Sequence, residues 1–217
     1  MDTERYSSPW LLLLAQLPSR PSSARVALWR RMRGVGATPV VNGAWVLPGA
    51  ELHAKFFEQS REIIVEQGGT AFVLNFSASS PNANDSIVRL FQADRAKEYD
   101  EFAERCAALL NEMGRESEAE KYTFAEMEES EQDLEKLARW LAKIQARDFF
   151  PDEHGQRSVA LLESCRSALE RFSRAVYAAE GLDDQQDNAR GDQDPVGLAT
   201  GPPAGCCRRR WLTGHRC

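Results

Sequence analysis

Residues 38–48, TPVVNGAWVLP, decide the fold of the N-terminal part of the chain. Two short runs of strand-forming residues, 38–41 and 44–47, flank the dipeptide Asn42-Gly43. This dipeptide is the strongest two-residue signal for a β-hairpin, because both positions tolerate a positive φ. Pro48-Gly49 then interrupts regular structure. The stretch therefore predicts two antiparallel strands joined by a tight turn.

The segments on either side extend the hairpin into an alternation of strands and helices. Residues 10–17 are a continuous apolar run, which is typical of a strand buried on both faces. Helices are predicted at 22–33 and 50–67, and a last strand at 70–76. The order βαββαβ belongs to the ferredoxin-like arrangement, so we predict an α+β, ferredoxin-like domain over residues 8–78.

Apolar spacing in these two helices predicts which side chains face the sheet. The residues expected to point inward are Ala24, Leu28, Met32 and Val35 in the first helix, and Leu52, Phe56, Ile63 and Ile64 in the second. Gly34 and Gly36 are expected to end the first helix.

A three-helix, mainly α-helical region is predicted at 83–180, after a linker at 79–85 (SSPNAND). The first apolar stripe runs to Met113 and is expected to stop at Gly114. The second helix opens with Thr123 and Glu126, which form a capping box. A third stripe follows, and its members are Val159, Leu162, Cys165, Leu169, Phe172 and Val176. Periodicity ends near Gly181, so 181–217 is predicted to be a disordered tail.

Charge is unevenly distributed along the 217 residues, whose net charge is −6. Residues 9–48 hold five arginines and no acid, whereas 112–135 hold ten acids and two bases. A local basic face can bind phosphate even on an acidic protein. No apolar run is long enough for a membrane span, and five cysteines without framework spacing indicate free thiols in a reducing compartment. We therefore expect a cytoplasmic protein with no membrane partner.

No catalytic constellation is present in the sequence. His53, His154 and His215 fall in three separate regions, and His53 is expected to be a solvated surface residue. The run 152–154 has metal-ligating side chains, but adjacent loop residues seldom converge on one ion. Cys206, Cys207, His215 and Cys217 form a ligand set by type only. The sequence therefore predicts no enzyme, no metal site and no cofactor.

The sharpest functional feature is a basic helical face with one aromatic side chain. Its members are Arg25, Trp29, Arg30, Arg31 and Arg33, of which Arg31 lies at the edge of the face. Guanidinium groups bind phosphates and other tetrahedral oxyanions in a bidentate way, and an aromatic ring adds a stacking surface. Three interpretations stay open: a solvated interface with the acidic helices, a nucleic-acid contact, or a small oxyanion site.

Residues 147–151, RDFFP, end the second predicted helix of the helical region. Two adjacent phenylalanines beside a charge pair indicate a structural corner. In this interpretation the rings are buried, and Arg147 and Asp148 bind neighbouring backbone.

Several stretches together resemble the ChrB family of bacterial chromate-resistance proteins. They are 10–18 (WLLLLAQLP), 25–36 (RVALWRRMRGVG), 42–48 (NGAWVLP), 90–99 (LFQADRAKEY) and 144–151 (IQARDFFP). The layout of the first segment is also similar to the middle domain of PaaX-type repressors, which has a ferredoxin-like fold. The resemblance implies a regulator-like protein associated with chromate-dependent control of an efflux transporter gene. Full-length members carry a further C-terminal domain, where this chain has 181–217 instead.

The leading hypothesis is a chromate- or oxyanion-responsive transcriptional regulator, or an accessory protein, of a chromate-resistance operon. Promoter DNA, chromate or a related oxyanion as effector, and a second copy in a homodimer are the expected partners. The alternative is a structural or interaction protein that binds no DNA and acts through helical dimerisation.

Overall fold

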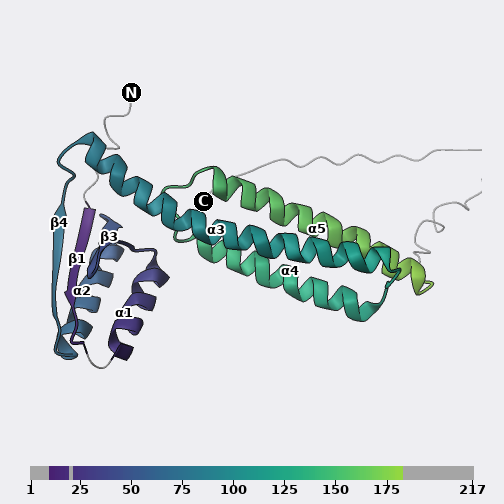
Figure 1. Cartoon of the computed structure of the whole chain (residues 1–217), viewed down its shortest axis with the longest axis horizontal. Helices are drawn as coiled ribbons and strands as arrows, with labels where there is room; N and C mark the ends of the chain where they lie inside the picture. Colours follow the sequence, from purple (N-terminus) through teal and green to yellow (C-terminus); the bar gives the residue numbers. More distant parts are fainter. Residues whose placement is uncertain (1–9, 20–21, 183–217) are drawn as a thin grey trace, which may run out of the picture. The chain divides into compact units, whose positions relative to one another are not determined.

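Four strands form one antiparallel sheet in the computed structural model, which describes residues 10–19 and 22–182 (Figure 1). The strands are β1 (Trp10–Gln16), β2 (Thr38–Val41), β3 (Ala44–Pro48) and β4 (Thr70–Phe76). Their order across the sheet is β2-β3-β1-β4. Leu12 of β1 pairs with Val46 of β3 on one side and with Leu74 of β4 on the other. The four predicted strands are thus confirmed to within one residue at their ends.

The hairpin between β2 and β3 forms at the predicted dipeptide. Gly43 has a φ of +78°, which an L side chain rarely adopts. A Cβ at this position would also lie only 2.4 Å from the carbonyl oxygen of Ala15, near the C-terminal end of β1. The turn therefore needs glycine for both conformation and space.

Helices α1 (Ser22–Val35) and α2 (Glu51–Glu66) pack on one face of the sheet. Met32 is buried there as predicted, with Leu28 and Val35 partly buried beside it. The inward face predicted for α2 is partly wrong, because the side chain of Leu52 is 79% exposed and that of Ile63 is 37% exposed. Ile64 is buried as predicted and Phe56 is partly buried, while Phe57 and Ser60 are buried in place of Leu52 and Ile63.

The other face of the sheet is covered at one end only. There Trp10 and Val46 pack with Phe91 of α3 (Pro81–Glu118). Further along β1 the same face is open, and Leu14 is 37% exposed. The prediction that β1 is buried on both faces therefore holds for its first residues and is wrong for its second half.

Helices α3, α4 (Phe124–Gln145) and α5 (Glu153–Ala179) lie lengthwise against one another (Figure 1). Their shared core is built largely from the predicted stripes, and its fully buried members are Phe102, Cys106, Ile144 and Cys165. Val159, predicted in the third stripe, is exposed instead. Cys106 and Cys165 are free thiols, as predicted. None of the helices in the described ranges is both long enough and apolar enough to cross a membrane.

Two predicted boundaries of the helical region are wrong. Residues 79–85 are not a linker, because the Ser80 hydroxyl caps α3 by accepting a hydrogen bond from the Ala83 N–H at 3.2 Å. Pro81 occupies the first turn, a position that tolerates proline. Gly114 does not stop α3, which continues to Glu118. The end of the helix is instead followed by Glu120 with a φ of +53°.

The predicted start of α4 is confirmed. Thr123 is the N-cap, and its hydroxyl accepts a hydrogen bond from the Glu126 N–H at 3.3 Å. Taken together, the described residues form an α+β structure that is mostly helical. The predicted tail falls outside the described residues from position 183 onward.

Candidate functional site

The basic face of α1 is divided by the fold into free and engaged side chains. Trp29 is 54% exposed, and Arg30 is exposed next to it. Within the described part of the chain, Arg30 has no hydrogen bond or ion pair with another residue. Arg25 is also exposed, and its Nη1 donates to the Ser19 carbonyl at 2.8 Å. The N-terminal two thirds of α1 thus present two guanidiniums and one indole to solvent.

Arg31 points to the neighbouring helix instead. Its Nε donates to the Ser60 hydroxyl of α2 at 2.9 Å, and its guanidinium carbon lies 4.7 Å from the centre of the Phe56 ring. A guanidinium above an aromatic face is attracted by the ring quadrupole. Arg31 therefore stabilises the packing of α1 against α2.

Arg33, at the end of α1, is bound to α3. Its Nη1 donates to Asp94, and its Nη2 donates to Glu98 at 2.8 Å. Of the three interpretations of the basic face, these contacts support for Arg33 the interface with an acidic helix. The five predicted site residues are therefore not brought together at one point.

The two carboxylates that hold Arg33 also hold two further arginines. Arg147 Nη2 donates to Glu98 at 2.7 Å, and Arg95, only 2% exposed, donates from Nη2 to Asp94 at 3.1 Å. We call Arg33, Asp94, Arg95, Glu98 and Arg147 the junction cluster. Three guanidiniums face two carboxylates, which leaves an excess of one positive charge.

Because the cluster is largely buried, its excess positive charge is poorly screened by solvent. Arg95 Nη1 lies 2.9 Å from Glu98, close enough for an ion pair, but its angle is not that of a hydrogen bond, and Arg95 Nε is buried without a partner. Burial lowers the pKa of Arg147, and the positive charges of Arg95 and Arg33 lower it further, while Glu98 raises it. The cluster therefore depends on its two carboxylates.

The junction cluster also holds the backbone at the end of α1. Arg147 Nη1 donates to the carbonyl of Arg33 at 3.3 Å, and Arg147 lies directly against Gly36. Gly36 has a φ of +87°, and a Cβ on it would lie 3.0 Å from both the Cβ and the carbonyl oxygen of Arg147. Glycine is required here by conformation and by the close approach of the chain after α4.

An aromatic corner lies beside the cluster and supports the structural interpretation of RDFFP, although the rings of Phe149 and Phe150 are partly rather than fully buried. Phe150 and Phe91 both contact Trp10, with ring centres 5.7 Å and 5.8 Å from that of the indole. Phe149 meets Phe91 edge-on at 6.1 Å. Asp148 accepts a hydrogen bond from the Phe150 N–H at 3.3 Å. These side chains pack between the sheet and α3.

Two polar contacts, one buried and one partly buried, stabilise the same corner. Trp10 Nε1 donates to the Asn84 side chain at 2.9 Å, and the Tyr99 hydroxyl donates to Asp148 at 2.9 Å. Burial and the hydrogen bond to Asp148 raise the pKa of Tyr99, so the phenol keeps its proton. Both contacts satisfy polar groups that would otherwise be buried without partners.

The two histidines within the described residues, His53 and His154, contact neighbouring backbone or side chains. His53 is not simply solvated as predicted, because its Nδ1 lies 2.7 Å from the Pro48 carbonyl and its ring meets Phe149 edge-on at 5.0 Å. His154 lies in the first turn of α5, where Asp152 is the N-cap and accepts from the His154 N–H at 2.9 Å. His215 and the cysteines of the tail lie outside the described residues.

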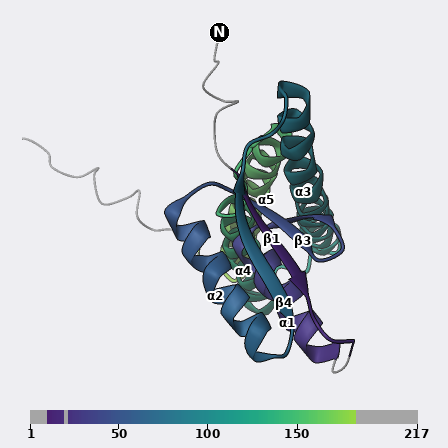
Figure 2. The same ribbon diagram turned by 90° about the vertical axis from the view of Figure 1, so that its left-hand side faces the viewer.

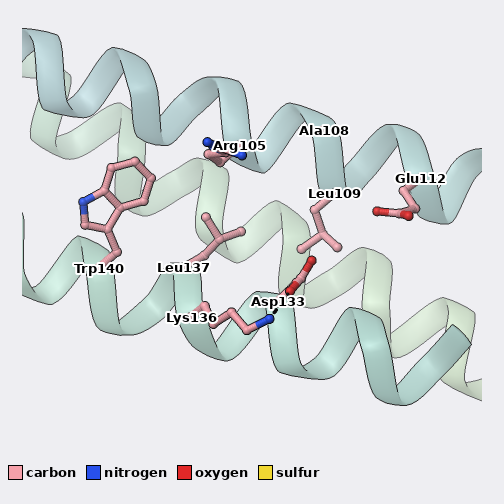
Figure 3. A pocket seen from close by; sticks show the side chains of 8 residues that line it. All are labelled: Arg105, Ala108, Leu109, Glu112, Asp133, Lys136, Leu137 and Trp140. Atoms are coloured by element: carbon pink, nitrogen blue, oxygen red, sulfur yellow. Dashed lines mark hydrogen bonds and ion pairs between the residues drawn. The ribbon is translucent and has the colours of Figure 1, made fainter. Parts of the chain in front are cut away.

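A shallow groove of about 470 Å³ runs between α3 and α4 (Figure 3). Leu109, Leu137 and Trp140 supply its apolar lining, and Figure 3 shows charged side chains along its rim. Arg105 and Lys136 on this rim are balanced by Glu112 and Asp133, and Lys136 Nζ is 2.7 Å from Asp133. With balanced charges and no converging polar groups, the groove shows no preference for an anion.

Sequence reasoning missed the junction cluster, although a signal for it existed. Asp94 and Glu98 are four residues apart and so share one face of a helix. Both carboxylates lie in ADRAKEY, and nothing in that stretch indicates which arginines they bind. Pairing them with Arg33 requires knowledge of how α3 crosses the end of α1, which no local pattern contains.

Fold and contacts define a mostly helical α+β protein in which ion pairs tie α1 to α3, and aromatic packing ties the sheet to α3. Comparison with known proteins identifies the family: a family model described as "Protein ChrB, N-terminal" matches residues 25–183. The chain belongs to this family. A curated relative, "Protein ChrB" of Cupriavidus metallidurans (strain ATCC 43123 / DSM 2839 / NBRC 102507 / CH34), is 28% identical over 155 residues. The alignment covers 70% of this chain and 44% of that protein, so the chain spans less than half the length of this relative. No solved structure matches.

Proposed function

We propose that this protein is a non-enzymatic, cytoplasmic transcriptional regulator, or accessory protein, of a chromate-resistance operon. Membership of the ChrB family supports the involvement in chromate resistance. The observation that supports a regulatory contact with DNA is the exposed face of α1, where Trp29 is 54% exposed beside the exposed Arg30.

Electrostatics favour phosphate as the ligand of this face. Residues 9–48 carry no acidic side chain, so no carboxylate of that segment competes for Arg25 and Arg30. Local positive charge rather than net charge sets the attraction to a phosphate backbone. Arg31 and Arg33 are engaged with α2 and α3, so we restrict the proposed DNA contact to Arg25, Trp29 and Arg30.

The test is a binding measurement with promoter DNA at several salt concentrations. Each phosphate contact contributes about 0.9 to the slope of log affinity against log salt. Replacing both Arg25 and Arg30 by Ala is expected to weaken binding about tenfold or more and to reduce the slope by about 2. Arg166→Ala on α5, also an exposed arginine, is the matched control and should leave both quantities unchanged. Salt-independent binding, or none, contradicts the proposal.

Chromate or a related oxyanion is the proposed effector, on the basis of the family alone. Titration of chromate into the complex with promoter DNA should lower the affinity, and sulfate at equal ionic strength is the control. If neither anion alters the affinity, this chain does not respond to the effector by itself.

The βαββαβ order and the packing of α1 and α2 on one face of the sheet support a ferredoxin-like assignment for residues 8–78. The alternative function is that of an interaction protein without DNA contact. It predicts that the Arg25 and Arg30 variants behave like the wild-type protein in every DNA assay.

A further inference from the structure

The outer edge of β4 is open within the described residues. β4 is the last strand of the sheet, and β1 is its one neighbouring strand (Figures 1 and 2). An edge strand carries unpaired backbone N–H and C=O groups that can pair with another strand. Phe72 is 59% exposed and Leu74 is 46% exposed, so large apolar side chains accompany this edge.

The two edges of the sheet differ in how they are protected. β2, at the opposite edge, contains Pro39, and its register with β3 shifts between Pro39 and Val41. Proline and bulges are common means of blocking the pairing of an edge with another chain. β4 has neither proline nor charge, and its seven residues pair with β1 in an unbroken register.

Charge singles out this edge as well. No charged residue occurs from 67 to 84, although 28% of the whole chain is charged. Two copies, each with a net charge of −6, repel one another over most surfaces. Within the β4 strand itself no like charges would oppose each other, so the strand edge offers a second copy no direct charge repulsion.

We propose that β4 pairs antiparallel with β4 of a second copy, which joins two sheets into one across a two-fold axis at Val73. In TAFVLNF the large apolar residues Phe72 and Leu74 flank this residue on either side. In such a pair, Phe72 lies opposite Leu74 of the second copy, and Leu74 lies opposite its Phe72. A two-fold interface requires this kind of self-matching surface.

The side chains on the open sheet face support the same geometry. Leu14 pairs with Phe72, and Leu12 with Leu74, so all four side chains lie on the face opposite α1 and α2. Dimerisation would extend this apolar strip from one copy into the next and cover part of Phe72 and Leu74. The proposal is independent of DNA binding, because no residue of α1 takes part in it.

The test measures the mass of the full chain in solution, without DNA, as a function of concentration. One chain has a mass of 24.3 kDa, and the wild-type protein is expected to show twice this value at micromolar concentration. Replacing Phe72 and Leu74 together by Lys places like charges opposite one another, and should weaken the dimer at least about tenfold. Val159→Lys is the matched control, because this side chain of α5 is 48% exposed.

A charge-swap experiment separates interface loss from misfolding. The Phe72→Glu, Leu74→Glu protein should be monomeric alone, as the lysine variant should be. An equimolar mixture of the two should form a mixed dimer, since opposite charges then face each other across the pair. A wild-type protein that stays monomeric, or a dimer that is unaffected by the β4 substitutions, overturns the proposal. A mixture that stays monomeric also overturns it.

Discussion

The charges of the junction cluster and those along the surface of the helical region look alike in sequence but differ in burial. In the junction cluster, the side chains of Arg33 and Glu98 are 20% and 17% exposed, and Arg95 is nearly inaccessible. On α4, Arg139 and Glu135 form a pair of 2.8 Å whose side chains are 60% and 65% exposed. Exposed pairs contribute little to stability, whereas loss of one partner from a buried set leaves an uncompensated charge. The comparison shows that burial, rather than the type of charged residue, determines how much an ion pair contributes to stability.

The largest effect is expected from Glu98→Ala. Glu98 receives Arg33 and Arg147 and lies within ion-pair distance of Arg95, so its removal leaves three guanidiniums facing Asp94 alone. Breaking a buried pair in this way costs about 3–5 kcal/mol. Urea unfolding followed by circular dichroism measures the free energy of unfolding, and Glu98→Gln is the matched control for side-chain shape. A loss below about 1 kcal/mol would show that the cluster is effectively solvated.

A second prediction compares two arginines of the same helix. Arg33→Ala removes a partner of Asp94 and Glu98 and is expected to cost about 1–3 kcal/mol of unfolding free energy. Arg30→Ala should change it by less than about 0.5 kcal/mol, because the side chain is exposed. The same unfolding assay decides. Equal losses for the two variants would remove the distinction between engaged and free arginines.

A third prediction concerns pH. Burial and the hydrogen bond with Glu126 raise the pKa of Glu116 from 4.5 to about 7, and Glu112 adds to this shift. The raised pKa means that the folded state favours the protonated acid. The contribution of Glu116 to stability is therefore present below about pH 4.5 and is lost as pH rises through 7. Glu116→Gln should raise the melting temperature by about 2–4 °C at pH 8 and change it little at pH 5.

Thermal unfolding of the wild-type and Glu116→Gln proteins at both pH values checks this expectation. Glu128→Gln is the control, because Glu128 is an exposed acid on the same helix as Glu126. A gain that is the same at pH 5 and pH 8 would contradict a titrating Glu116.

The smallest effect is expected on the exposed surface of the helical region. Arg139→Ala removes the pair with Glu135 and should alter the free energy of unfolding by less than about 0.5 kcal/mol. Urea unfolding at low and at high salt measures it. A loss comparable to that of Arg33→Ala would mean that burial is not what separates the two groups of charges.

The sequence was sufficient to predict most of the sheet, because its signals are local. Asn42-Gly43 sets the hairpin, and strand bounds follow from short apolar runs between Gly and Pro. Helical ends were harder. The stretch 79–85 has the composition of a loop, but Ser80 and Pro81 also make a good helix start.

Errors inside the helices have a tertiary origin. A glycine in a helix interior costs only about 1 kcal/mol, which the packing of Met113 and its neighbours in the bundle outweighs at Gly114. On α2, hydrophobic spacing favours the stripe with Leu52 and Ile63, but the buried stripe contains Ser60, whose hydroxyl accepts a hydrogen bond from Arg31. A polar residue that becomes buried through a distant partner cannot be recognised from hydrophobic spacing.

The basic face of α1 shows the same limit for the candidate site. All five residues were found by their type and spacing, yet the sequence does not separate Arg33, which is held by α3, from Arg30, which is free within the described residues. Helical spacing predicts that Arg30 and Arg33 share a face. Only Arg33 binds carboxylates, because α3 crosses at its end of the helix.

α3 has a mechanical consequence. Its 38 residues form one unbroken rod of about 57 Å, at 1.5 Å per residue. In the N-terminal part of α3, Phe91 packs against the sheet. Towards its C-terminal end, Met113 is buried in the core of the helical bundle. With no proline inside the rod after its first turn, it has no ready pivot. A rotation of the sheet against α3 at Phe91 would therefore also shift the packing of the bundle around Met113.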